Sequence, residues 1–287
     1  MKIKQKLWIT YIGESTHKKG ILMPSINDLI NKASIEESFD NMKSIDIIKT
    51  VRLQTINDNF GISAADFKSN EALLTWLIID DSSYILEFNG EAAVCDGQNI
   101  FVNELTQFSG RKDILVGQSL LNQDKPIHPF LTVDNIVKLN NKNYKACGAT
   151  PLYRKCCEIL STMALKAKVD FADNGFPCRC ILAIVTDGGN YERYASGKTF
   201  GPDDVKTLID ELGEGLIVYF MGIEGNTRVN FKKIAMDMGI HDKNIIISKS
   251  SPDEIKSAFR SISKSISSAS KSSRVFSEVS TTGGFLD

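Results

Sequence analysis

From residue 73 onward, short apolar runs alternate with segments whose apolar residues recur every three or four positions. A short, nearly continuous apolar run is typical of a strand buried on both faces, whereas spacings of three and four indicate one side of a helix. We therefore predict strands at residues 73–79, 114–121, 130–133, 181–185, 216–221 and 245–247.

Helical spacing lies between these strands. Leu152, Cys156, Ile159 and Met163 follow one another at intervals of four, three and four residues. Further helices are predicted near 94–108, from 202 onward, at 231–238 and from 251 to 266. Strands that alternate with helices of this length form a parallel sheet with right-handed crossovers. The predicted fold class is α/β, a doubly wound, mostly parallel sheet with helices on both faces.

The two ends of the chain depart from this alternation. Residues 1–70 offer a possible strand at 7–12, a helical segment near 26–33 and a mixed segment near 42–53, so we predict a small N-terminal α+β module of unknown fold. The α/β domain is assigned to residues 71–270. Half of the residues from 261 to 280 are serine, and we predict a Ser-rich flexible tail at 271–287.

The charge balance narrows the class of partner. The chain has 34 Lys and Arg against 35 Asp and Glu, a formal charge of −1, which gives no basic surplus for nucleic acid or anionic lipid. Every apolar run is shorter than the roughly 20 residues that a membrane-spanning helix needs. The start of the chain favours a strand over a signal peptide, so we expect a cytoplasmic protein with reduced, mostly buried cysteines.

Three clusters of oxygen-bearing side chains follow predicted strands or open a helix. They are Asp-Asp-Ser-Ser-Tyr at 80–84, Gly-Ala-Thr-Pro-Leu at 148–152 and Thr-Asp-Gly-Gly-Asn at 186–190. Ligands of such sheets bind beyond the carboxyl ends of the strands. Carboxylates and hydroxyls without His or Cys suit Mg²⁺ or another hard cation.

Each cluster also has a local explanation. Thr150 before Pro151 is a good helix start, and residues 80–82 are suitable caps for a following helix. The Asp187-Gly188-Gly189 segment is equally typical of a turn. The order and spacing of all three clusters together are more specific than any one of them.

In that order and spacing, residues 71–270 resemble the von Willebrand factor A (VWA) domain family. The family's metal-ion-dependent adhesion site (MIDAS) consists of Asp-x-Ser-x-Ser, a Thr and a Thr-Asp-Gly turn. Here Asp80-Asp81-Ser82-Ser83-Tyr84, Thr150 and Thr186-Asp187-Gly188 stand in those places. Residues 258–270 look like the closing helix of small bacterial VWA proteins, including tellurium-resistance types.

The resemblance implies a bound Mg²⁺ or Mn²⁺ held by Asp80, Ser82, Thr150 and Asp187, with Ser82 and Thr150 touching the ion and the aspartates acting mostly through water. Tyr84 replaces the second motif serine, so we expect weaker or lost metal affinity. The residues expected to contact a partner are Tyr84, Gly148, Gly189, Asn190 and Tyr191.

Three functions remain open at this point. The first is a non-enzymatic protein–protein interaction module, in which an Asp or Glu of another protein completes the coordination of Mg²⁺. The second is a metal-free VWA scaffold in a bacterial stress-response or defence complex. The third is a Mg²⁺-dependent phosphoryl-transfer enzyme, which the sequence disfavours because it has neither a phosphate-binding loop nor a nucleophile elbow.

Overall fold

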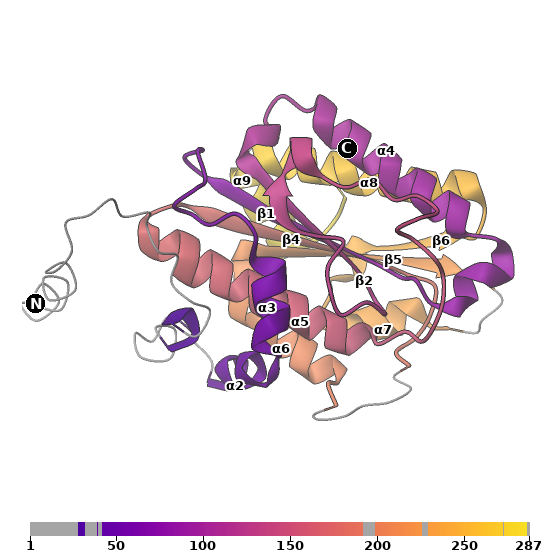
Figure 1. Ribbon diagram of the computed structural model, residues 1–287, viewed down its shortest axis with the longest axis horizontal. Helices are drawn as coiled ribbons and strands as arrows, with labels where there is room; N and C mark the ends of the chain where they lie inside the picture. The colour runs from indigo at the N-terminus through magenta and orange to yellow at the C-terminus, as the bar shows by residue number, and fades with distance from the viewer. Residues whose placement is uncertain are drawn as a thin grey trace, which may run out of the picture.

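The structure is a computed structural model that describes residues 28–31, 39, 42–191, 199–225, 229–271 and 273–285. The strand expected at 7–12 lies outside these residues. A single mixed sheet forms the centre of the molecule, with strand order β3-β2-β1-β4-β5-β6 (Figure 1). The strands are β1 (Ala72–Ile79), β2 (Ile114–Leu120), β3 (His128–Thr132), β4 (Cys178–Thr186), β5 (Leu216–Glu224) and β6 (Ile245–Lys249).

Five of the six strands are parallel, and only the edge strand β3 runs antiparallel, to β2. The central strand β1 is buried along its whole length. Its alternate residues serve two separate cores: Trp76 faces one and Leu77 the other. This is why the strand reads as a continuous apolar run.

Helices cover both faces of the sheet (Figure 1). One core contains residues of α2 (Met42–Thr50), α3 (Leu53–Phe60), α5 (Leu152–Ala164), α6 (Pro202–Leu212) and α7 (Phe231–Asp237). The other contains residues of α4 (Glu91–Gln107), α8 (Pro252–Lys271) and α9 (Ser273–Thr282). The predicted α/β class, with a mostly parallel sheet between two helical layers, is confirmed. Among the described residues, no helix is both long and apolar enough to cross a bilayer.

The described part of residues 1–70 shares a core with the sheet. Ile48 of α2 and Ile56 of α3 are buried in the same cluster as α5. The backbone N–H of Ile62 donates to the carbonyl of Phe130 in edge strand β3 (2.9 Å). Residues 42–62 therefore extend one helical layer and border the sheet edge, whereas the sequence suggested a module of their own.

The expected flexible tail also differs from the structure. Residues 273–282 form helix α9, in which Phe276 and Val279 are buried against the core of α4 and α8. Beyond it, the ring of Phe285 stacks on Tyr219 of β5 with centroids 4.6 Å apart. The many serines made this segment resemble a flexible tail, although Phe276 and Val279 have the three-residue spacing of a helix.

Candidate functional site

The carboxyl ends of β1 and β4 bring Asp80 next to the Thr186-Asp187 pair. The two strands are paired up to Ile79 and Val185, so the next residues of both lie side by side. Asp80 is fully buried, and one carboxylate oxygen, Oδ2, accepts from the Thr186 hydroxyl (2.6 Å) and from the backbone N–H of Asp187 (3.3 Å). These two donors thus help to fix the orientation of the carboxylate.

Ser82 links the first loop to Asp187. Its backbone N–H donates to Asp80 Oδ1 (2.8 Å), and its hydroxyl donates to Asp187 Oδ1 (3.1 Å). The short 3-10 helix Ser83–Phe88 follows, with Ser82 at its N-cap position but without a side-chain capping bond. The alternative in which these residues cap a helix is therefore wrong for Ser82, whose hydroxyl faces the aspartates.

Thr150 approaches the same aspartates from the loop before α5. It forms an antiparallel bridge with Tyr191, with N–H to carbonyl distances of 3.0 and 2.8 Å. A methyl group added at Gly188 would lie 3.1 Å from the Thr150 hydroxyl oxygen, so that oxygen lies directly over the Asp187 turn. The N-cap position of α5 is occupied by Pro151 and carries no side-chain capping bond, so Thr150 does not cap this helix.

A third aspartate, Asp81, which the sequence placed in the first motif without a role, and Asn122, which the sequence analysis missed, connect the loops. Asp81 Oδ1 accepts from the backbone N–H of Asn122 (2.8 Å) and from its side-chain amide (3.1 Å). The side-chain oxygen of Asn122 accepts from the backbone N–H of Ala149 (2.9 Å), and its side-chain NH₂ group also donates to the Ala149 carbonyl. Asn122 follows β2, so the rule that sites lie after strand ends could have identified it.

Tyr144 and Cys147 attach the loop before α5 to the first motif. The buried Tyr144 hydroxyl donates to the main-chain carbonyl of Asp80 (2.7 Å). The backbone N–H of Cys147 donates to the main-chain carbonyl of Asp81 (2.6 Å). Four chain segments therefore meet at one edge of the sheet in a single hydrogen-bonded network. Of the predicted metal-binding residues, the structure brings together Asp80, Ser82, Thr150 and Asp187.

The site concentrates negative charge in a region that excludes water. Burial raises the pKa of Asp80, and burial together with the charge of Asp80 raises the pKa of Asp187 to about 8. Burial is also the main cause that raises the pKa of Asp81 to about 6. Without a cation, the two facing carboxylates of Asp80 and Asp187 would thus retain a proton near neutral pH.

The donor set fits a hard divalent cation. Asp187 Oδ2 is buried and has no hydrogen-bond partner among the described residues, so one carboxylate oxygen remains for a ligand. Ser82 and Thr150 add hydroxyl oxygens, which suit Mg²⁺ or Mn²⁺. Within the described ranges, no group of three or more His, Cys, Asp or Glu side chains is placed to hold a metal. The candidate site depends instead on two aspartates and two hydroxyls.

The residues expected to meet a partner surround this network. Tyr84, which follows Asp80 after β1, is 44% exposed. Tyr191, which follows Asp187 after β4, is 56% exposed. Gly148 is exposed with φ +87°, a conformation that favours glycine. Gly189 is half-buried, and the side-chain oxygen of Asn190 accepts from the backbone N–H of Tyr153 at the start of α5 (3.1 Å). Asn190 therefore also has a structural role.

Comparisons with known proteins give likeness in fold only. No family model and no curated protein sequence matches this chain. Among solved structures, the pilus adhesin SpaC from Lactobacillus rhamnosus GG is similar with a TM-score of 0.51 and 14% identity, over 70% of this chain and 31% of that one. The chain thus matches less than a third of that adhesin's length.

Two further similar structures carry the VWA name. The vWF domain of the type V pili tip protein Mfa5 from Porphyromonas gingivalis is 10% identical, with a TM-score of 0.47, over 70% of this chain and 97% of that one. The von Willebrand factor type A protein from Catenulispora acidiphila is 14% identical, with a TM-score of 0.44, over 70% and 43%. The chain shares with the SpaC adhesin an α/β fold, here six strands in a mostly parallel sheet between two layers of helices.

Proposed function

We propose that this protein is a non-enzymatic interaction module that binds a carboxylate of another protein through a divalent cation. One observation carries the proposal. Asp80 and Asp187 are both buried and joined through Ser82 and Thr186, while Asp187 Oδ2 is left without a partner among the described residues. Two buried acidic groups this close are costly unless a cation or a proton compensates their charge.

In this proposal Ser82 and Thr150 offer hydroxyl oxygens to Mg²⁺ or Mn²⁺, and Asp80 and Asp187 offer negative charge, mostly through water. The cation, when bound, supplies the positive charge that attracts an Asp or Glu side chain of the partner. Asn122 and Tyr144 hold the loops in place through their bonds to Asp81 and Asp80. Because Tyr84 stands where the motif has serine, this site binds the cation more weakly than a complete one.

The surroundings of the site favour a protein partner over a small molecule. Tyr84, Leu86 and Tyr191 are large, exposed apolar side chains on the loops that carry the motif. Exposed aromatic side chains beside polar groups are typical anchors of protein–protein interfaces. Specificity would come from these residues and from Gly148, Gly189 and Asn190.

Tyr84 also favours a second candidate, a VWA scaffold that works without metal. A bacterial stress-response or defence complex in the cytoplasm is our proposal for its setting. Cys156, Cys157 and Cys180 are buried, as expected for cysteines in a reducing compartment. A Mg²⁺-dependent phosphoryl-transfer reaction is the least supported alternative, because the sequence has neither a phosphate-binding loop nor a nucleophile elbow.

Isothermal titration of the full chain with Mg²⁺ and Mn²⁺ tests the proposal. We expect saturable binding to one site, abolished in Asp187→Asn and strengthened in Tyr84→Ser, which restores the motif serine. Glu214→Gln is the matched control, since Glu214 is exposed in the turn that precedes β5 at the opposite edge of the sheet. If the wild-type protein and Tyr84→Ser both took up no metal at millimolar concentration, the scaffold would be the better account.

A further inference from the structure

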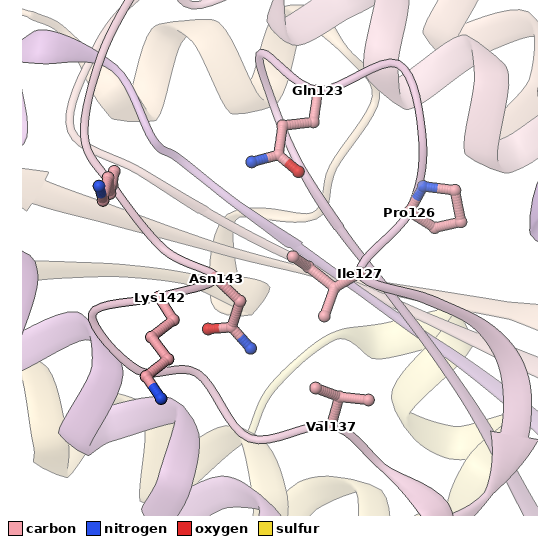
Figure 2. A pocket seen from close by; sticks show the side chains of 7 residues that line it. Gln123, Pro126, Ile127, Val137, Lys142 and Asn143 are labelled. Carbon is pink, nitrogen blue, oxygen red and sulfur yellow. The ribbon is translucent and has the colours of Figure 1, made fainter.

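A pocket lies beside the candidate metal site. Its volume is about 400 Å³, and two loops form its walls: residues 123–127 between β2 and β3, and residues 137–145 before α5. Figure 2 shows Gln123, Pro126 and Ile127 on the first loop and Val137, Lys142 and Asn143 on the second. Lys145 completes the lining. We refer to these seven residues as the lysine pocket.

Both walls of the lysine pocket are continuous with the loops of the metal site. Gln123 directly follows Asn122, which bonds to Asp81 and Ala149. On the other wall, Lys142 and Lys145 lie on either side of Tyr144 in sequence, and the Tyr144 hydroxyl donates to the Asp80 carbonyl (2.7 Å). The pocket and the candidate metal site are therefore neighbouring parts of one surface.

Buried groups hold the pocket in shape. The backbone N–H of Ile127 donates to the carbonyl of Gln118 in β2 (2.8 Å), and the buried Gln98 side chain of α4 donates to the carbonyl of Val137 (3.1 Å). The Asn143 side chain forms its hydrogen bonds within its own loop. Its amide donates to the carbonyl of Lys138 (3.0 Å), and its oxygen accepts from the N–H of Asn140 (2.8 Å). The pocket is thus preformed, and binding there requires little ordering of the chain.

The chemistry of the lining favours an anion attached to an apolar group. Lys142 and Lys145 are exposed, and neither forms an ion pair with a described residue. Among the neighbouring charges Asp124 and Lys125 offset each other, and Glu91, whose carboxylate accepts from the N–H of Ala146 (2.7 Å), is matched in number by Lys138 of the same loop. Lys142 and Lys145 therefore remain as a local positive surplus in a chain of net charge −1. Ile127, Val137 and Pro126 add apolar surface between them.

We propose that the lysine pocket is a second subsite for the same partner: it takes an acidic side chain that lies a few residues from the carboxylate at the metal site. This inference rests on the proposed function, because the first carboxylate sets the register of the partner segment. The positive pocket complements an acidic peptide in charge, and its apolar surface accommodates a neighbouring aliphatic or aromatic side chain.

The test uses fluorescence anisotropy with short labelled peptides and the full chain in Mg²⁺. One peptide carries a single Glu in a neutral background that contains Leu, and a second set carries an added Glu at varied spacing. At the best spacing we expect the second Glu to increase affinity about fivefold, the effect of two partly exposed ion pairs. Lys142→Gln/Lys145→Gln should remove this gain and leave the affinity for the single-Glu peptide unchanged.

The matched control is Lys112→Gln/Lys243→Gln, which removes the same charge from exposed lysines that precede β2 and β6 at the other edge of the sheet. This variant should keep the gain from the second Glu. If both double variants lost the affinity gain from the second Glu equally, the gain would be due to net charge alone, and the proposed subsite would be overturned. So would a peptide series in which no spacing of the second Glu improves binding.

The experiment distinguishes failure of the lysine pocket from failure of the metal-mediated function. Single-Glu binding that needs Mg²⁺ and is lost in Asp187→Asn, combined with no effect of the Lys142 and Lys145 substitutions, would contradict the lysine pocket alone. Single-Glu binding that is unchanged by EDTA and by Asp187→Asn would contradict the metal-mediated function itself.

Discussion

At the residue scale, the site is defined by carboxylates that the fold places out of contact with water. Asp80 and Asp187 lie at the ends of neighbouring central strands, so their main chains are fixed by sheet hydrogen bonds before any ligand arrives. Thr186, Ser82 and the backbone N–H of Asp187 satisfy most of their oxygens. The remaining oxygen, Asp187 Oδ2, is the feature that points to a cation.

This arrangement predicts a pH dependence of stability in the metal-free protein. Burial and the charge of Asp80 raise the pKa of Asp187 from the model-compound value of 3.8 to about 8. Between these two values the folded state binds more protons than the unfolded state, so the free energy of unfolding decreases as the pH rises from about 4 to about 8. Urea denaturation in EDTA should show this decrease in the wild-type protein.

In Asp187→Asn the contribution of this group to the pH dependence should disappear, because the amide does not titrate. Added Mg²⁺ should stabilise the wild-type protein more at about pH 8 than at about pH 6, since protons compete with the cation at the lower pH. Equal pH slopes for wild type and Asp187→Asn would contradict the raised pKa of this carboxyl.

At the element scale, four loops that follow or precede strands and helices form one network. Asn122 after β2 connects the loop after β1, through Asp81, to the loop before α5, through Ala149. The Thr150–Tyr191 bridge then joins that loop to the one after β4. The bonds between loops thus help to hold each one in position.

Asn122→Ala tests this dependence. The substitution leaves a buried Asp81 oxygen and the Ala149 backbone with fewer partners, so we expect a loss of about 1–3 kcal/mol in the free energy of unfolding. Affinity for Mn²⁺ should fall about tenfold, as for other residues that orient metal ligands. Asn141→Ala, in an exposed turn of the same region, should change neither quantity. An unchanged Mn²⁺ affinity in Asn122→Ala would show that the loops are positioned without it.

The sequence predicted the elements and most of the site because both depend on local patterns. Apolar runs marked the strands, and the strand-end rule placed Asp80 and Asp187 at one edge. Tyr144 was missed because its role arises from a contact between loops that are distant in sequence, whereas Asn122 follows β2 and could have been identified by the strand-end rule. The alternative explanation in which Thr150 caps α5 is wrong because Pro151 occupies the N-cap position.

At the scale of the whole molecule, both ends of the described chain extend the two helical layers. Residues 42–62 pack on the side of α5, and α9 packs on the side of α4 and α8 (Figure 1). The sequence did not show this, since contacts between these segments and helices distant in the chain leave no local pattern. Phe276 of α9 is buried, with the guanidinium of Arg179 above its ring at 5.2 Å.

Phe276→Ala should therefore lower the free energy of unfolding by up to about 3 kcal/mol, because the substitution opens a cavity between α9 and the core. Chemical denaturation measures the change, and Glu278→Ala on the exposed side of the same helix serves as the control. A Phe276→Ala protein as stable as wild type would favour the mobile tail suggested by the serine-rich sequence.

The central claim, that three chain segments surround one cation, is tested most directly by soaking crystals of the full chain in Mn²⁺ and recording anomalous diffraction. The account predicts one anomalous peak bounded by the hydroxyls of Ser82 and Thr150 and adjacent to the carboxylates of Asp80 and Asp187. Crystals of Asp187→Asn should lack this peak. Wild-type crystals that show no peak there, or show manganese only elsewhere on the surface, would contradict it.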